Sequence, residues 1–138
     1  MRVVLTAGCF DLFHVAHLRY LQNASALGDR LIVSVTMDEY VGKGPGRPVV
    51  PQEERLEIVR AIVRGFDCES EVDLYRCGIE ALKKWKPDVF CKGDDWKVRG
   101  LPDEITSYCK QNGIEIAFTK PNPQTTGNII KRLQCEYS

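Results

Sequence analysis

His14 and His17 are the only two histidines in this chain of 138 residues, and their spacing suits phosphate chemistry. Three residues apart at the start of a predicted helix, they share one face and point toward its N-terminal end. A helix N-terminus attracts anions, so two imidazoles there could donate hydrogen bonds to phosphate oxygens. The pair alone leaves two other interpretations open: solvent-exposed helix residues, or half of a zinc site with Cys9, for which the spacing suggests no further ligands.

A glycine- and proline-rich loop carries the next candidates. The segment Gly42–Pro48 holds three Gly and two Pro in seven residues, which is too irregular for a helix or a strand. Lys43 and Arg47 in it could close over phosphates as a lid, or could be ordinary solvated charges. Arg55 follows among three glutamates near the start of a predicted helix, a pattern that favours a surface ion pair.

Two polar clusters lie further along the chain. A predicted substrate-facing loop follows an apolar segment and contains Asp94, Asp95 and Trp96. The two carboxylates could accept hydrogen bonds from a base or a hydroxyl group, and a substrate ring could stack on the indole. The same carboxylates could bind magnesium or form an acidic turn. Thr125 and Thr126 precede a helical segment, where they could cap the helix or form a second phosphate-binding helix start.

Composition narrows the possible partners. Nineteen basic and nineteen acidic residues give a formal net charge of zero. This balance argues against a nucleic-acid backbone or an anionic membrane as the main partner. Six cysteines without a CxxC pair, and no segment typical of a signal peptide, favour a reduced, cytoplasmic location. No apolar run approaches the roughly 18 residues of a membrane span, and the length predicts one domain, residues 1–138.

The elements that must position these residues alternate along the chain. Apolar and β-branched runs predict strands at 2–7, 31–35, 71–74, 88–91 and 114–118, and helical periodicity predicts helices at 15–27, 52–64, 79–86, 103–112 and 126–133. This order predicts an α/β fold: a single-domain, Rossmann-like, open five-stranded parallel sheet with helices on both faces. Ligands bind such sheets beyond the carboxyl ends of the strands, where the polar segments described above collect. Neither a P-loop nor a dinucleotide fingerprint is present.

With these segments assembled, the chain resembles the nucleotidyltransferase superfamily marked by an HxGH motif. It is most similar to the cytidylyltransferase-like family, which includes glycerol-3-phosphate cytidylyltransferase and the nucleotidyltransferase domain that acts on heptose 1-phosphate. The segments 8–21 and 27–33 resemble the first β-α-β unit of both enzymes. Lys43–Pro48 with Glu53–Arg55 is closer to the heptose enzyme, and Gly93–Trp96 is closer to the glycerol phosphate enzyme.

The resemblance implies that a substrate phosphate attacks the α-phosphorus of a nucleoside triphosphate and that pyrophosphate leaves. His14 and His17 would stabilise the α-phosphate, and Lys43 would close on the phosphates as the third catalytic residue. Mg²⁺ would bridge the phosphates, and the sequence does not identify its protein ligands. The remaining residues implied in nucleotide binding are Gly8, Cys9, Phe10, Arg47, Arg55, Asp94, Asp95, Trp96, Lys120, Thr125 and Thr126.

The chain departs from the family pattern at three places. Ala16 replaces the Gly of HxGH, and Cys9 replaces a Thr or Ser of the glycerol phosphate enzymes. The segment that corresponds to the family's RTxGxST pattern lacks the Arg and the Gly, and Lys120 is a candidate to replace the charge of the missing Arg. The expected reaction moves a nucleoside monophosphate, preferably CMP from CTP, onto a phosphorylated sugar or polyol for surface-glycan synthesis. The alternatives are ATP-dependent transfer to heptose 1-phosphate and a nucleotide-binding regulatory module without turnover. A homodimer is expected by likeness to the family.

Overall fold

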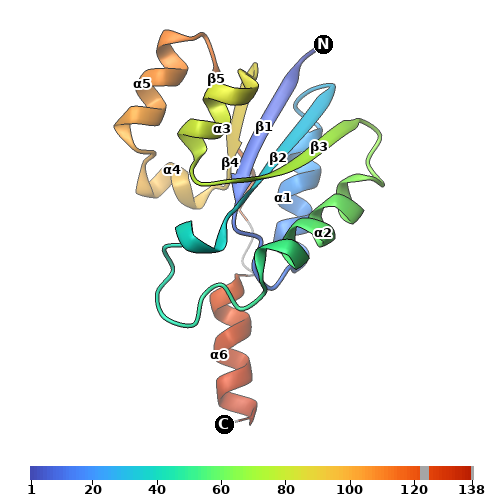
Figure 1. The fold of residues 1–138 in the computed structure, drawn as a ribbon, viewed down its shortest axis with the longest axis vertical. Helices are drawn as coiled ribbons and strands as arrows, with labels where there is room; N and C mark the ends of the chain where they lie inside the picture. The colour runs from blue at the N-terminus through green and yellow to red at the C-terminus, as the bar shows by residue number, and fades with distance from the viewer. Residues whose placement is uncertain (122–124, 138) are drawn as a thin grey trace.

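Five parallel strands form one open sheet in the computed structural model, which describes residues 1–121 and 125–137 (Figure 1). The strands lie side by side in the order β3-β2-β1-β4-β5. The chain therefore forms the central strand β1 first, adds β2 and β3 on one side of it, and then adds β4 and β5 on the other side. The carboxyl ends of β1 and β4 therefore flank the point where the winding reverses. This arrangement confirms the predicted fold class. The strands are β1 Val3–Gly8, β2 Arg30–Thr36, β3 Glu69–Tyr75, β4 Val89–Lys92 and β5 Glu115–Phe118.

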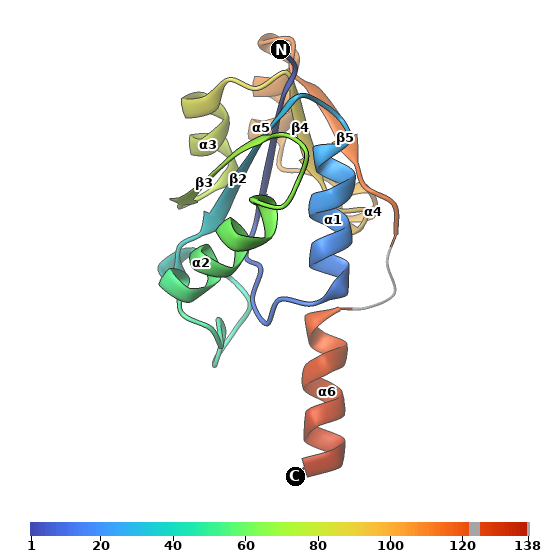
Figure 2. The same ribbon diagram turned by 90° about the vertical axis from the view of Figure 1, so that its right-hand side faces the viewer.

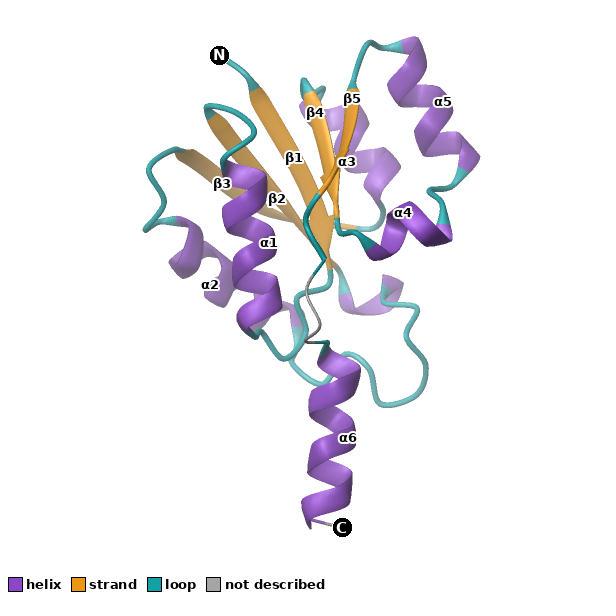
Figure 3. Ribbon diagram, turned by 180° about the vertical axis from the view of Figure 1, so that it is seen from behind, coloured by secondary structure: helices purple, strands orange, loops and turns teal. Residues whose placement is uncertain are grey.

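Helices cover both faces of the sheet (Figure 3). They are α1 Val15–Ser25, α2 Gln52–Val63, α3 Gly78–Trp85, α4 Asp95–Arg99, α5 Asp103–Gln111 and α6 Thr126–Tyr137, with a short 3₁₀ helix at Asp38–Tyr40. Alternate residues of β1 point to opposite faces, so Val4 packs with α1 and α2 while Leu5 packs with α3 and α5. Two hydrophobic cores result, one on each face of the sheet.

Helix α6 lies apart from both helical layers. It begins beside the N-terminal end of α1 and extends away from the carboxyl-end edge of the sheet (Figure 2). No helix among residues 1–121 and 125–137 is long and apolar enough to cross a membrane.

The ten predicted elements are present, with ends displaced by a few residues, and two short helices were not predicted. One is the 3₁₀ helix, and the other is α4. The prediction of a loop at Asp94–Trp96 is therefore wrong in part, since Asp95 and Trp96 begin α4. A helix of five residues shows no apolar periodicity in the sequence, and Gly100, with a φ of +82°, ends it after little more than one turn.

The turn between α1 and β2 packs closely against the start of β1. A Cβ atom at Gly28 would lie 2.6 Å from the carbonyl oxygen of Arg2. That oxygen accepts the N–H groups of Asp29 and Arg30, at 2.7 and 3.2 Å, and so cannot move away freely. Only glycine fits at this position without displacing the start of β1.

We expect Gly28→Ala to lower the free energy of unfolding by about 1–3 kcal/mol, because the added methyl group forces the turn away from Arg2. Urea unfolding near neutral pH measures this change. Gly65→Ala is the matched control, since a Cβ there would meet its nearest atom at an ordinary 3.6 Å. Equal losses in the two variants would contradict the steric argument.

Candidate active site

Two adjoining cavities open at the carboxyl-end edge of the sheet. The larger has a volume of about 660 Å³ and lies between α1, the loop that carries Lys43, and the start of α6. The smaller, of about 320 Å³, lies between the end of β1, the segment after β2, and α4. The two cavities share five lining residues: His17, Tyr20, Lys43, Gly93 and Asp95. They therefore form two parts of one site.

Every predicted site residue except Arg55 lines one of the two cavities. The predicted residues in the larger cavity are His14, His17, Lys43, Arg47, Asp94, Asp95, Lys120, Thr125 and Thr126. Those in the smaller cavity are Gly8, Cys9, Phe10, His17, Lys43, Asp95 and Trp96. The fold thus brings together side chains that are more than a hundred residues apart in the sequence.

The two histidines are held in one orientation by backbone donors. His14 is the N-cap of α1, and its Nδ1 accepts the N–H of Ala16 at 3.2 Å. The Nδ1 of His17 accepts the N–H of His14 at 3.1 Å. A backbone N–H can only donate, so each neutral ring carries its proton on Nε2. Both Nε2–H groups are therefore donors, as phosphate binding requires. Ala16 contributes its backbone N–H to this arrangement, which any residue could supply.

Burial keeps both imidazoles neutral. It lowers the pKa of His14, and the positive charge of Lys43 lowers that pKa further. Burial also lowers the pKa of His17 to about 3, with further contributions from His14 and Lys43. The rings stack with their centroids 4.0 Å apart, which disfavours two adjacent cations. These side chains are consequently suited to donate hydrogen bonds and not to act as acids.

The start of α6 is connected to this pair. The Nε2–H of His14 donates to the hydroxyl oxygen of Thr126 at 3.2 Å, and that hydroxyl donates to the backbone carbonyl of Asp11 at 3.1 Å. Thr125 accepts the N–H of Asn128 at 3.1 Å, which confirms its predicted capping role. Two helix N-termini, those of α1 and α6, therefore face the larger cavity.

The carboxylate of Asp11 organises the turn after β1 and the loop beyond Lys43. It is buried and accepts hydrogen bonds from the Nε of Arg47 at 2.8 Å and from the N–H groups of Val49 and Val50 at 2.9 and 2.8 Å. Burial by itself would raise the pKa of Asp11, but these hydrogen bonds and the charge of Arg47 outweigh it and hold the pKa below its usual value. Asp11 is thus an anion that fixes one end of the loop.

The turn from Gly8 to Phe13 is unusually tight. Phe10 and Leu12 have φ angles of +55° and +51°, in the left-handed region that residues with a Cβ rarely adopt. A Cβ atom at Gly8 would lie only 3.1 Å from the ring of Phe10, so Gly8 makes room for this buried ring. The turn directs His14 toward the cavity.

Arg55 corrects one sequence interpretation. It is fully buried, not part of a surface ion pair with its neighbouring glutamates, and it lines neither cavity. Its guanidinium donates to the carbonyls of Cys9 and Val50 at 2.7 and 2.9 Å and to the carboxylate of Asp38 at 2.6 Å. Arg55 therefore joins three segments behind the site. It is a positioning residue.

The sequence-based candidates omit two residues that contribute to the site. One is Asp11, and the other is Lys92, the last residue of β4. Lys92 lines the smaller cavity, donates to the carbonyl of Ala7 at 2.7 Å, and lies 5.0 Å from the ring centroid of Trp96. Its position at the carboxyl end of a predicted strand is the signal that could have identified it.

Comparison with known proteins identifies the family. A model of the cytidylyltransferase-like family matches residues 5–135. This chain belongs to the cytidylyltransferase-like family. The predicted class, a nucleotidyltransferase, is thereby confirmed.

Two relatives cover almost the whole chain. It is 41% identical over 140 residues to the bifunctional protein HldE of Aeromonas hydrophila, with 96% of this chain and 28% of HldE covered. This chain thus spans less than a third of that protein. It is 38% identical over 135 residues to the FAD synthase of Pyrococcus abyssi, with 94% of this chain and 90% of the synthase covered.

A solved structure supports the fold. The lipopolysaccharide core biosynthesis protein of Thermoplasma volcanium superposes with a TM-score of 0.70 at 24% identity. The superposition covers 88% of this chain and 98% of that protein. This likeness confirms the Rossmann-like arrangement of the sheet.

The protonation of the histidines can be measured directly. Long-range ¹H–¹⁵N spectra between about pH 5 and pH 8 should show His17 with its proton on Nε2 throughout, because burial lowers its pKa to about 3. The folded state then binds fewer protons than the unfolded state below the ordinary histidine pKa of 6.5, so the free energy of unfolding should fall as the pH drops below that value. The urea-unfolded protein, in which both rings titrate normally, is the control. A folded-state His17 that titrates near 6.5 would contradict this assignment.

We expect Asp11→Asn to lower the free energy of unfolding by about 2–4 kcal/mol near neutral pH, because it leaves Arg47 without its buried partner. The folded-state pKa of Asp11 is lowered, so its stabilisation is present above the unfolded pKa and is lost as the pH falls through the folded value. The variant should lack this part of the acid dependence. Urea unfolding at several pH values measures both effects, and the exposed Asp67→Asn is the control. A variant as stable as the control would contradict the role assigned to Asp11.

Proposed function

We propose that this chain transfers a nucleoside monophosphate from a nucleoside triphosphate to a phosphate monoester and releases pyrophosphate. The observation that carries the proposal is the convergence of two neutral Nε2–H donors, a lysine and two helix N-termini on the larger cavity. Helix N-termini and oriented N–H donors are suited to phosphate groups. No comparable set of donors would be needed for an uncharged ligand.

The proposed reaction needs no nucleophile from the enzyme. An oxygen of the acceptor phosphate attacks the α-phosphorus, a new P–O bond forms, and the bond to the β-phosphate breaks to release pyrophosphate. The attacking oxygen is already anionic, so no base has to remove a proton. His14, His17 and Lys43 stabilise the charge that develops on the α-phosphoryl oxygens. The histidines do this as neutral hydrogen-bond donors, in agreement with their lowered pKa values, and His14 does so by exchanging its hydrogen bond to Thr126 for one to the phosphate.

The β- and γ-phosphates are assigned to the start of α6 and to Arg47. Thr125 and Thr126 line the larger cavity at this helix start. Among the described residues, the Nη2 of Arg47 is a buried side-chain nitrogen without a hydrogen-bond partner, although its Nε is bound to Asp11. That nitrogen is itself buried, but Arg47 lines the larger cavity, where a guanidinium favours an oxygen of a phosphate group.

Magnesium is proposed as the companion of the triphosphate. Within residues 1–121 and 125–137 no group of three or more His, Cys, Asp or Glu side chains could hold a metal ion. This fits Mg²⁺, which keeps several water ligands and binds largely through phosphates with one or two carboxylates. Asp94 and Asp95 line the larger cavity and are the carboxylates available for it. When bound, Mg²⁺ would neutralise part of the phosphate charge.

We propose ATP as the donor and CTP as the second candidate. The relative named FAD synthase makes a product that contains an adenylyl group, which favours ATP. The sequence favoured CTP through the likeness of Gly93–Trp96 to cytidylyltransferases. Within this segment Trp96 lines only the smaller cavity, whereas Gly93, Asp94 and Asp95 line the larger one, so the segment does not choose between the two bases. A sugar phosphate, as expected from the sequence, or a flavin phosphate would serve as acceptor.

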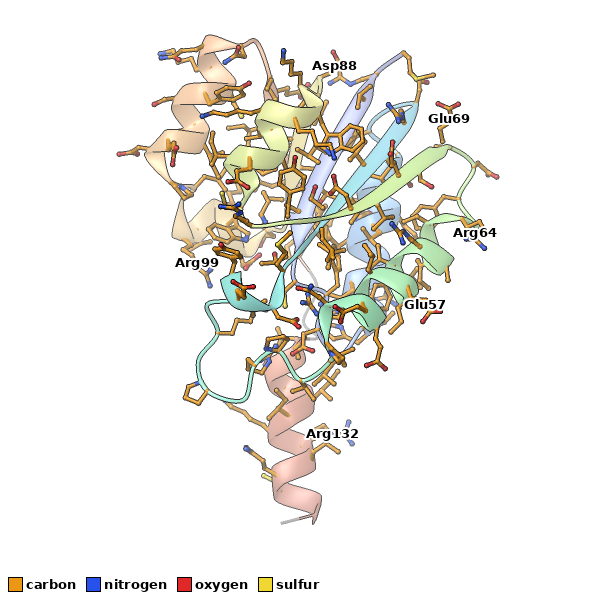
Figure 4. The ribbon with its side chains drawn as sticks, in the orientation of Figure 1. Glu57, Arg64, Glu69, Asp88, Arg99 and Arg132 are labelled. Atoms are coloured by element: carbon orange, nitrogen blue, oxygen red, sulfur yellow. The ribbon has the colours of Figure 1, made fainter. Side chains whose placement is uncertain are left out.

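Pyrophosphate release with Mg²⁺ tests the proposal when ATP and CTP are each combined with hexose and heptose 1-phosphates, glycerol 3-phosphate and flavin mononucleotide. We expect release with ATP and one class of acceptor. His14→Ala and His17→Ala should each lower kcat by about 10²- to 10³-fold, as loss of a transition-state donor does. Arg64→Ala is the control, because this residue at the end of α2 is exposed and lines neither cavity (Figure 4).

Two outcomes would decide against parts of the proposal. Nucleotide binding without pyrophosphate release for any pair would favour the binding module without turnover. Pyrophosphate release with CTP but not with ATP would support the proposed reaction and show that the donor is CTP.

A further inference from the structure

Building on the proposed function, we propose that the smaller cavity binds the acceptor and that Lys92 selects a phosphate monoester there. Lys92 lines this cavity and not the larger one. It is distinct from the residues assigned above to the triphosphate. Three features support this assignment: the position of the two cavities, the incompletely balanced charge of Lys92, and the two cations that contact Trp96.

The position of the cavities follows the geometry of substitution at phosphorus. The attacking and leaving oxygens lie roughly in line on opposite sides of the α-phosphorus. His17 and Lys43 line both cavities, so the reacting phosphorus belongs at their junction. Thr125 and Thr126 line only the larger cavity, which assigns the leaving pyrophosphate to that side. The attacking phosphate must then approach from the smaller cavity.

The charge of Lys92 is balanced only in part, by the nearby carboxylate of Asp95. Its ammonium donates to the carbonyl of Ala7, and across the described residues it forms no ion pair with a carboxylate. An ammonium has three N–H donors, so two of them remain for a ligand. Burial lowers the pKa of Lys92 to about 8, which leaves it mainly cationic near neutral pH. A partly buried cation of this kind favours an anionic ligand over a neutral one.

A second feature orients this cation. The ring of Trp96 contacts two cations: the ammonium of Lys92 lies 5.0 Å from its centroid, and the guanidinium of Arg99 lies 4.8 Å from it. Arg99 lines the same cavity and extends from α4 (Figure 4). Together with Lys43, these residues give the smaller cavity three cationic side chains, against the single carboxylate of Asp95. This balance matches the dianion of a phosphate monoester.

Calorimetric titration with inorganic phosphate tests the inference. The protein is first saturated with the nonhydrolysable α,β-methylene analogue of ATP, which occupies the triphosphate region. We expect Lys92→Met to weaken phosphate binding by about 10- to 100-fold, the effect of losing a hydrogen bond to a charged group. Lys92→Arg should restore most of the affinity. Lys97→Met is the matched control, because Lys97 lies nearby in α4, is exposed and lines neither cavity.

The affinity for the analogue separates the two cavities. It should be unchanged in Lys92→Met if this residue binds the acceptor. Unchanged phosphate affinity in Lys92→Met, or an equal loss of analogue affinity, would overturn the inference. Lys92→Gln, which can still donate to Ala7, gives the same comparison if the methionine variant does not fold.

Failure of the proposed function gives a different result. In that case the wild-type protein does not bind the analogue. Titration with phosphate alone then tests Lys92 by itself. Phosphate binding that is lost in Lys92→Met and kept in Lys97→Met supports the anion site in the smaller cavity, and equal binding by both variants overturns it.

Discussion

The buried carboxylate of Asp11 holds the functional edge of this protein together. It neutralises Arg47 and binds the backbone of Val49 and Val50, and the carbonyl of the same residue receives the hydroxyl of Thr126. A buried ion pair is tolerated only when its remaining hydrogen-bonding capacity is satisfied, and Asp11 meets this requirement through backbone donors. The turn after β1, the loop beyond Lys43 and the start of α6 therefore adopt one mutual arrangement.

That arrangement suits the proposed chemistry. The three segments that we propose to face the phosphates come from distant parts of the chain, and transfer between two phosphorylated substrates would depend on the prior alignment of both. Arg55 supports the same edge from beneath, through Cys9, Val50 and Asp38. In the proposed reaction His17 supplies a donor whose orientation is fixed before the substrate arrives, and His14 supplies a second by giving up its hydrogen bond to Thr126.

Sequence patterns predicted the sheet and most of the helices, and every predicted site residue except Arg55 lines a cavity, because apolar periodicity and the carboxyl-end rule are local or topological signals. They did not predict α4, which is too short to show periodicity. The glutamates beside Arg55 suggested a surface pair, whereas its true partners are backbone carbonyls and Asp38, which only tertiary packing brings near. Asp11 and Lys92 were missed for the same reason: their roles depend on partners far away in the sequence.

In the proposed reaction the acceptor phosphate attacks the nucleotide directly, and the enzyme forms no covalent intermediate. The stereochemical course at phosphorus tests it, with an α-thiotriphosphate of defined configuration as the donor and ³¹P NMR of the product as the readout. A single in-line displacement inverts the configuration at the α-phosphorus, and inversion is the predicted result. Retention would require two successive displacements, with the nucleotide attached to a side chain in between, and would contradict this account.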